Sequence, residues 1–171
     1  QIYITMNLIK NILLVGGGGY VGTVLTKFLL SKGFYVKCFD NFIYNHSSCV
    51  SEFIGKKKYE LLKGNILNKN NLSTALEGID YVVLLAGLVG DQITTKYPEE
   101  SNLINNIGIR NVIDLCAKHN SEKFIFVSTC SNYGLIENNE LADENHKLKP
   151  LSLYAKSKVK KSKPKESSKI V

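Results

Sequence analysis

Four consecutive glycines at positions 16–19 restrict the fold of this chain more than any other feature. They follow the apolar run NILLV at residues 11–15. Glycine loses more conformational freedom on folding than any other residue, so such a cluster suits a backbone that turns tightly or lies close to a ligand. The GxxGxxG spacing of Gly16, Gly19 and Gly22 after an apolar strand is typical of a turn that presents helix N–H groups to a phosphate. We therefore expect a pyrophosphate to bind at this turn.

The rest of the chain alternates between short apolar runs and helical segments. Residues 20–33 repeat apolar side chains at helical spacing and end in glycine. Further helices are expected at 70–78 and 98–119, and strands at 11–15, 34–39, 59–64, 81–87 and 123–128. Strands that are apolar on both faces are typical of a parallel sheet covered on both sides. The expected fold is therefore a doubly wound parallel α/β sheet.

An acidic residue, Asp40, ends the second expected strand. A carboxylate in that place accepts hydrogen bonds from the adenosine ribose of NAD and repels the additional phosphate of NADP. Together with the glycine turn, it predicts NAD as the cofactor. A structural glycine turn with a surface aspartate is the alternative that the residues alone leave open.

Five segments resemble motifs of the NAD-dependent sugar epimerase/dehydratase family, within the extended short-chain dehydrogenase/reductase superfamily. VGGGGYVG at 15–22 is similar to the family's TGGxGFIG, and FDN at 39–41 to the end of its second strand. GNIL at 64–67 is similar to its GD[IL]x, and LLAGLVGD at 84–91 to its HLAA segment. INNIGIRNVIDLC at 104–116 is similar to N-x-x-G-T-x-N-[LV].

This resemblance extends from about residue 10 to residue 160 and implies a Rossmann-type fold. Asn65 replaces an aspartate that contacts the adenine amino group, and its carbonyl oxygen can accept the same hydrogen bond. The cofactor-binding residues that the resemblance implies are Gly16, Gly19, Tyr20, Val21, Gly22, Asp40, Asn41, Asn65, Ile66, Leu85, Ala86, Gly87, Asn105, Tyr154 and Lys158.

Two further motifs carry the chemistry that the resemblance implies. FVSTCSNYG at 126–134 is similar to SSxxxYG and places Thr129 at the catalytic Ser/Thr, while PLSLYAKSK at 150–158 is similar to PxSxYxxSK. The second motif gives Tyr154 and Lys158 as the catalytic pair, and residues four apart share one face of a helix. A phenol titrates near pH ~10, and a neighbouring cation favours its ionised form. Tyr154 would then take a proton from a substrate hydroxyl as hydride passes to NAD, Thr129 would hydrogen-bond the same oxygen, and Lys158 would also hold the nicotinamide ribose.

The residues after Thr129 bear on the type of reaction. Family members that eliminate water across C5–C6 of the sugar carry an Asp–Glu pair where this chain has Cys130 and Ser131. Neither is a carboxylic acid, so 4,6-dehydration is disfavoured, and we expect Cys130 to have a packing role. The predicted function is NAD-dependent redox chemistry at a sugar carbon of a nucleotide-diphosphate sugar, with epimerisation as the expected reaction. The alternatives are a sugar-nucleotide dehydratase or reductase, or an NAD-binding module without turnover.

Charge and composition argue against other partners. The formal net charge is +7, but the segment 156–171 holds seven lysines and one glutamate, so the preceding residues are almost neutral. A protein that binds nucleic acid carries its basic face on the folded body, so we expect no nucleic-acid partner. No apolar run approaches the ~20 residues that cross a bilayer. The four cysteines have no metal-ligand spacing, and we expect no metal site and a cytoplasmic location.

The expected domain boundaries follow from the same patterns. An NAD-binding domain is expected over residues 8–160, followed by a disordered Lys/Ser-rich tail at 161–171, where Pro164 would break a helix. The substrate domain that the resemblance implies has no counterpart after residue 160, so the chain is expected to be the N-terminal portion of such an enzyme. A naturally minimal family member is the alternative, and a homodimer is left open as the assembly.

Overall fold

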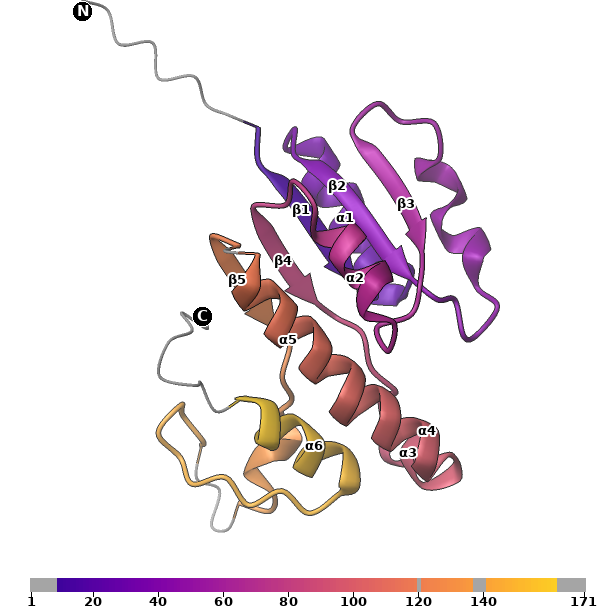
Figure 1. Cartoon of the computed structure of the whole chain (residues 1–171). Helices are drawn as coiled ribbons and strands as arrows, with labels where there is room; N and C mark the ends of the chain where they lie inside the picture. Colours follow the sequence, from indigo (N-terminus) through magenta and orange to yellow (C-terminus); the bar gives the residue numbers. More distant parts are fainter. Residues whose placement is uncertain (1–8, 120, 137–140, 163–171) are drawn as a thin grey trace, which may run out of the picture.

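The computed structural model describes residues 9–119, 121–136 and 141–162, and it contains a five-stranded parallel sheet (Figure 1). The strands lie in the order β3-β2-β1-β4-β5, and every neighbouring pair is parallel. Their bounds are β1 Asn11–Val15, β2 Tyr35–Asp40, β3 Tyr59–Lys63, β4 Tyr81–Leu84 and β5 Lys123–Phe126. The expected doubly wound parallel sheet is confirmed, with β4 and β5 shorter than the apolar runs that predicted them.

The chain reverses its direction of travel across the sheet at β1. It runs outward from β1 through β2 to β3, then returns to add β4 and β5 on the other side of β1. Connections that leave neighbouring strands in opposite directions open a crevice at their carboxyl ends, where ligands of α/β sheets bind. The glycine turn follows β1 directly and therefore lies at this crevice.

Helical segments connect the strands in chain order. They are α1 Tyr20–Ser31, η1 Ser47–Phe53, α2 Lys69–Leu76, α3 Asp91–Lys96, α4 Pro98–Asn102, η2 Leu103–Gly108, α5 Ile109–Lys118, η3 Cys130–Tyr133 and α6 Leu153–Ser162. The expected helix at 98–119 is interrupted by η2, one turn of π-helix, and Figure 1 shows α4 to α5 as one continuous rod. Sequence patterns predicted neither η1 nor α3. In the described part of the chain no helix has the length and apolarity to cross a membrane.

Two apolar layers hold the sheet between these helices. On one face α2 and α5 pack over residues such as Leu13 and Phe39, and Figure 1 shows both helices on the near side of the sheet. On the other face α1 and η1 cover residues such as Leu14 and Val36. Alternate residues of each central strand enter opposite layers, which explains why these strands are apolar throughout.

The outer strand β5 departs from this pattern. Phe124 and Phe126 pack against the α2–α5 layer, but Ile125 and Val127 are each 43% exposed on the opposite side. Ile125 pairs with Val83 of β4, which belongs to the α1 layer, so the α1 side of β5 is open. Helices therefore cover both faces of the sheet as expected, except on the α1 side of β5 in the described part of the chain.

The last described element, α6, lies against α3, η2 and η3. It ends at Ser162, so it extends two residues past the expected domain boundary at residue 160. Residues 163–171 of the expected tail, and residue 8 at the other boundary, lie outside the described residues.

Candidate functional site

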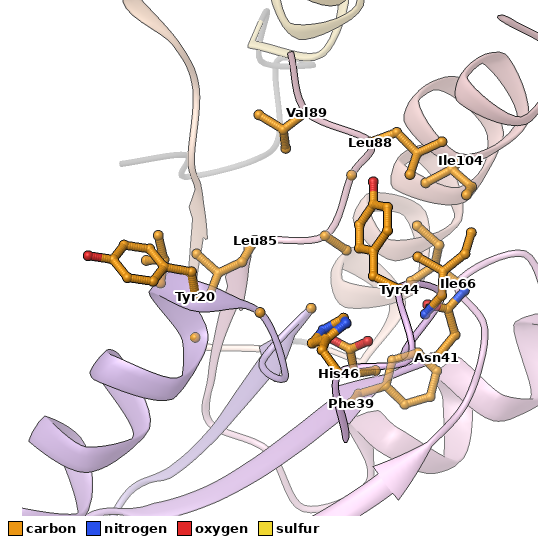
Figure 2. Close-up of a pocket in the computed structure, with 18 of the residues that line it drawn as sticks. Tyr20, Phe39, Asn41, Tyr44, His46, Ile66, Leu85, Leu88, Val89 and Ile104 are labelled. Atoms are coloured by element: carbon orange, nitrogen blue, oxygen red, sulfur yellow. The ribbon is translucent and has the colours of Figure 1, made fainter. Parts of the chain in front are cut away.

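A pocket of about 580 Å³ opens at the carboxyl ends of the strands around β1 (Figure 2). Twelve of the residues predicted to bind the cofactor line it. They are Gly16, Gly19, Tyr20, Val21, Gly22, Asp40, Asn41, Asn65, Ile66, Leu85, Ala86 and Gly87. These residues come from separate segments of the sequence, and the crevice beside β1 brings them together.

The glycine turn lines the pocket and leaves no room for a side chain at Gly16 or Gly22. Gly16 has a φ of +84°, and a Cβ there would lie 2.5 Å from the backbone nitrogen of Ala86. A Cβ on Gly22 would collide with the backbone of Gly17. Helix α1 begins directly after Gly19, and no side chain caps its first N–H groups. Unpaired N–H groups at a helix N-terminus attract anions, so the turn suits a pyrophosphate.

Both carboxylate oxygens of Asp40 are held by backbone N–H groups. Oδ2 accepts a hydrogen bond of 2.9 Å from Gly18, and Oδ1 accepts one of 2.7 Å from Phe42. Each oxygen keeps a second lone pair for another donor. The carboxylate is therefore fixed between the glycine turn and the loop after β2, where it can accept hydrogen bonds from ligand hydroxyls.

Asn65 and Ile66 shape the side of the pocket next to β3. The Asn65 Oδ1 already accepts the N–H of Leu67 at 2.9 Å, so a ligand donor would share this oxygen. Asn111 of α5 donates to the carbonyl oxygen of Ile66 at 3.1 Å. A Cβ on Gly108 would lie 2.5 Å from Ile66, so glycine at that position lets α5 approach this wall.

Asn105 does not line the pocket, unlike the other predicted cofactor residues between positions 16 and 105. It is buried in the π-helical turn η2. Its Oδ1 accepts the N–H of Leu88 at 2.8 Å, and its Nδ2 donates to the carbonyl oxygen of Leu88 at 2.9 Å. Its observed role is therefore to hold the loop 85–89, which does line the pocket.

The three predicted catalytic residues lie beyond the lining of this pocket. Thr129 follows β5, is partly buried, and accepts the N–H of Ser131 at 3.2 Å as the N-cap of η3. Cys130 is exposed, so the expectation that it has a packing role is wrong. It is the first residue of η3.

Lys158 is 4% exposed although it carries an ammonium group. Its Nζ donates to the carbonyl oxygen of Val127 at 2.9 Å and lies 4.7 Å from the ring centre of Phe126 and 5.8 Å from that of Tyr154. Burial lowers its pKa to about 8, because it disfavours the charged form. At neutral pH the side chain is still mainly protonated. A cation therefore lies one helical turn from the partly buried phenol, as the i, i+4 spacing predicts.

The loop after β2 contributes lining residues that no sequence motif predicted. Ile43, Tyr44, His46 and Cys49 all face the pocket. They belong to an irregular loop and the start of η1, where no periodic pattern indicates which side chains turn inward. Only the position of this loop directly after Asp40 could have placed it near a ligand.

The pocket and the predicted catalytic residues lie in a part of the chain that matches a known protein family. The model of the NAD dependent epimerase/dehydratase family matches residues 12–163 of the chain. The chain belongs to this family. The predicted cofactor residues and the three predicted catalytic residues all fall inside the matched region, and the family resemblance of the sequence motifs is thereby confirmed.

Relatives of this chain include two proteins named as sugar 4-epimerases. The bifunctional UDP-glucose 4-epimerase and UDP-xylose 4-epimerase 1 of Pisum sativum is 30% identical over 158 residues, which are 88% of this chain and 45% of the relative. The N-acetyl-α-D-glucosaminyl-diphospho-ditrans,octacis-undecaprenol 4-epimerase of Escherichia coli O157:H7 is 32% identical over 150 residues, 86% of this chain and 40% of the relative.

Among solved structures, the UDP-glucose 4-epimerase of Thermus thermophilus in complex with NAD superposes with a TM-score of 0.78. It is 25% identical and covers 88% of this chain and 48% of that one. The chain thus spans less than half the length of each of these three proteins.

Proposed function

We propose that this chain forms the NAD-binding portion of an enzyme that carries out redox chemistry at a sugar carbon of a nucleotide-diphosphate sugar, with epimerisation as the reaction. One observation carries the proposal. The glycine turn and the doubly held Asp40 carboxylate meet in one pocket. Membership of the NAD dependent epimerase/dehydratase family supports the same conclusion.

The residues present fit NAD. A side chain on Gly16 or Gly22 would collide with backbone, so the turn keeps the open cradle that a pyrophosphate requires. Asp40 can accept hydrogen bonds from the adenosine ribose and would repel a 2′-phosphate. When bound, NAD supplies the acceptor and donor of hydride.

Side chains of this chain would carry out the proton transfer. Tyr154 would accept the proton of a substrate hydroxyl and later return one, while Thr129 hydrogen-bonds the same oxygen. The Lys158 ammonium lies 5.8 Å from the Tyr154 ring centre and would favour the phenolate. A base with a pKa close to the working pH transfers protons most effectively.

Dehydration is less well supported. Cys130 and Ser131 follow Thr129, and neither side chain can serve as a carboxylic acid in an elimination. Reduction of a sugar-nucleotide and cofactor binding without turnover are the other functions that the same site would serve.

The test combines cofactor binding with turnover. We expect isothermal titration to show one NAD per 171-residue chain. We expect little turnover of UDP-glucose or UDP-N-acetylglucosamine, because the chain spans less than half of its relatives and contacts remote from the reacting carbon contribute to rate.

In a longer protein that joins this chain to a substrate domain, Tyr154→Phe should abolish epimerisation and leave NAD affinity unchanged. Tyr97→Phe, at an exposed tyrosine outside the pocket, is the matched control. Failure to bind NAD, or full activity of Tyr154→Phe, would contradict the proposal.

A further inference from the structure

Helix α1 has an apolar side that is exposed to solvent. We call it the α1 stripe, and it consists of Tyr20, Val21, Val24 and Phe28. These positions share one side of the helix, because residues three, four, seven and eight apart lie close together on a helical surface. They are 55–88% exposed, whereas Thr26 and Leu29 on the opposite side are buried. The outer side of a helix that packs on a sheet is normally polar, so an apolar stripe there indicates that another surface covers it.

A second exposed apolar area lies on the same face of the sheet. It is the open α1 side of β5, which we call the β5 slot and which consists of Ile125 and Val127. On the opposite face both α2 and α5 pack on the sheet, whereas the described helices on this face, α1 and η1, leave β5 uncovered. Strands lie about 4.8 Å apart and packed helices about 10 Å apart, so one helix covers about two strands. The slot is therefore about one helix wide.

The α1 stripe and the β5 slot are neighbours. Val21 lines the pocket together with Leu85, which follows β4 and packs in the α1 layer. The side of α1 that carries Val21 and Phe28 therefore faces β4, the strand that pairs with β5. Tyr20 and Val24 are the most exposed members of the stripe and lie on the outer side of the helix, away from the sheet.

We propose that this face binds a second copy of the chain, with α1 of each copy lying in the β5 slot of the other. A two-fold axis parallel to the strands would place the two α1 helices side by side between the two sheets, which is a self-complementary contact. A single helix from another source could fill the slot, but it would lie beside α1 and leave Tyr20 and Val24 exposed. A second copy offers both a projecting helix and a slot, so it covers the whole face at once.

The exposed area fits such a dimer. The six side chains of the stripe and the slot present roughly 600 Å² per copy, if each of them offers about 150–200 Å² when fully exposed. This estimate lies at the upper end of the patches that monomers carry, about 300–600 Å². It approaches the ~800 Å² per partner of a stable interface, and polar residues at the rim, such as exposed Lys27, would add to it.

Two variants with opposite charges test this arrangement. Val24→Asp and Ile125→Lys each place a charge against an apolar surface, so each variant alone should self-associate at least about tenfold more weakly than the native chain in sedimentation velocity. In an equimolar mixture, the acidic and basic side chains meet at one of the two equivalent contacts, and the other contact keeps its native residues. The mixture should therefore associate within about threefold of the native chain.

Controls separate loss of the interface from loss of the fold. Val24 and Ile125 are exposed and lie outside the lining of the pocket, so circular dichroism and thermal denaturation of each variant should match those of the native chain. Leu103→Asp makes the same kind of change at an exposed apolar residue of η2, which continues into α5. It should leave self-association unchanged.

Three outcomes would overturn this inference. The first is a mixture that associates as weakly as the single variants, and the second is association that Leu103→Asp abolishes and Val24→Asp leaves intact. The third is a native chain that stays monomeric at its highest soluble concentration, which would mean that another part of a longer protein covers this face. None of these outcomes bears on the proposed function, which NAD titration tests separately.

Discussion

The carboxamide of Asn105 pairs with both backbone polar groups of Leu88, at 2.8 Å to the nitrogen and 2.9 Å to the oxygen. Asn105 lies in the π-helical turn before α5, and Leu88 lies in the loop that follows β4. The amide therefore satisfies the backbone N–H and C=O of Leu88, which lie beyond the end of β4. The extra residue of the π-turn occurs where the helix must present Asn105 to the loop, in keeping with the frequent placement of π-bulges at functional sites.

Replacing this amide should loosen the pocket. Asn105→Leu would leave the buried N–H and C=O of Leu88 unpaired, and we expect the free energy of unfolding to fall by about 2–4 kcal/mol. NAD affinity should fall as well, because the loop 85–89 lines the pocket. Urea denaturation and isothermal titration measure the two effects. Asn102→Leu, at an exposed position one turn earlier, should change stability by less than about 0.5 kcal/mol.

Gly22 should be far less tolerant of a methyl group than Gly19. A Cβ on Gly22 collides with the backbone of Gly17, whereas a Cβ on Gly19 has its nearest neighbour at 3.5 Å. We expect Gly22→Ala to lower the free energy of unfolding by about 1–3 kcal/mol, the usual cost of overpacking. Gly19→Ala should leave it nearly unchanged. Thermal denaturation compares the two variants, and equal losses would contradict the observed packing of the turn.

Asp40 should determine the choice between NAD and NADP. In the native chain we expect NAD to bind more tightly than NADP, because the fixed carboxylate repels a 2′-phosphate. Asp40→Ala should narrow the difference between the two affinities by weakening NAD binding and relieving the repulsion of NADP. Parallel isothermal titrations with both cofactors measure this. A native preference for NADP would show that the proposed role of Asp40 is wrong.

Lys158 should make stability depend on pH in the alkaline range. Its pKa is about 8 in the folded chain, below the ordinary value of 10.5. Between these values the unfolded chain binds a proton that the folded chain has released, so this group makes the free energy of unfolding rise with pH. Below about pH 8 the full cost of burying the charge remains.

Lys158→Met removes this titration. The stability of the variant relative to the native chain should therefore be greatest near pH ~7 and should decline steadily toward pH ~10. Urea denaturation at several pH values across this range tests the prediction, with exposed Lys156→Met as the control on the same helix. If the difference in the free energy of unfolding between Lys158→Met and the native chain stays constant with pH, the pKa of Lys158 is not lowered by burial.

The open side of β5 should promote self-association of the isolated chain. Ile125 is 43% exposed on a strand that pairs only with β4 among the described residues. Exposed apolar strand edges recruit other chains. We expect sedimentation velocity to show concentration-dependent association, reduced by Ile125→Lys. Leu135→Lys, at an exposed leucine outside the strands, should have little effect. If the native chain sediments as a monomer at high concentration, the open side of β5 does not promote self-association.

The alternation of apolar runs and helical segments determined the parallel fold, because strands buried on both faces leave a continuous apolar signal. It also located the glycine turn and Asp40, since both occur at fixed places relative to the strands that precede them. The spacing of Tyr154 and Lys158 likewise predicted a shared helix face, because that relationship is local.

Only the tertiary structure decided which distant residues meet. The sequence predicts that Asn105 binds the cofactor, and only the packing of η2 against the loop after β4 shows that its amide pairs with Leu88. The inward orientation of Tyr44 and His46 depends on two left-handed residues in an irregular loop, which has no periodic signal. The open face of β5 depends on which helices cover the sheet. Contacts of this kind join residues far apart in sequence. A local sequence pattern can predict that a side chain is buried, but it does not predict which residue the side chain contacts.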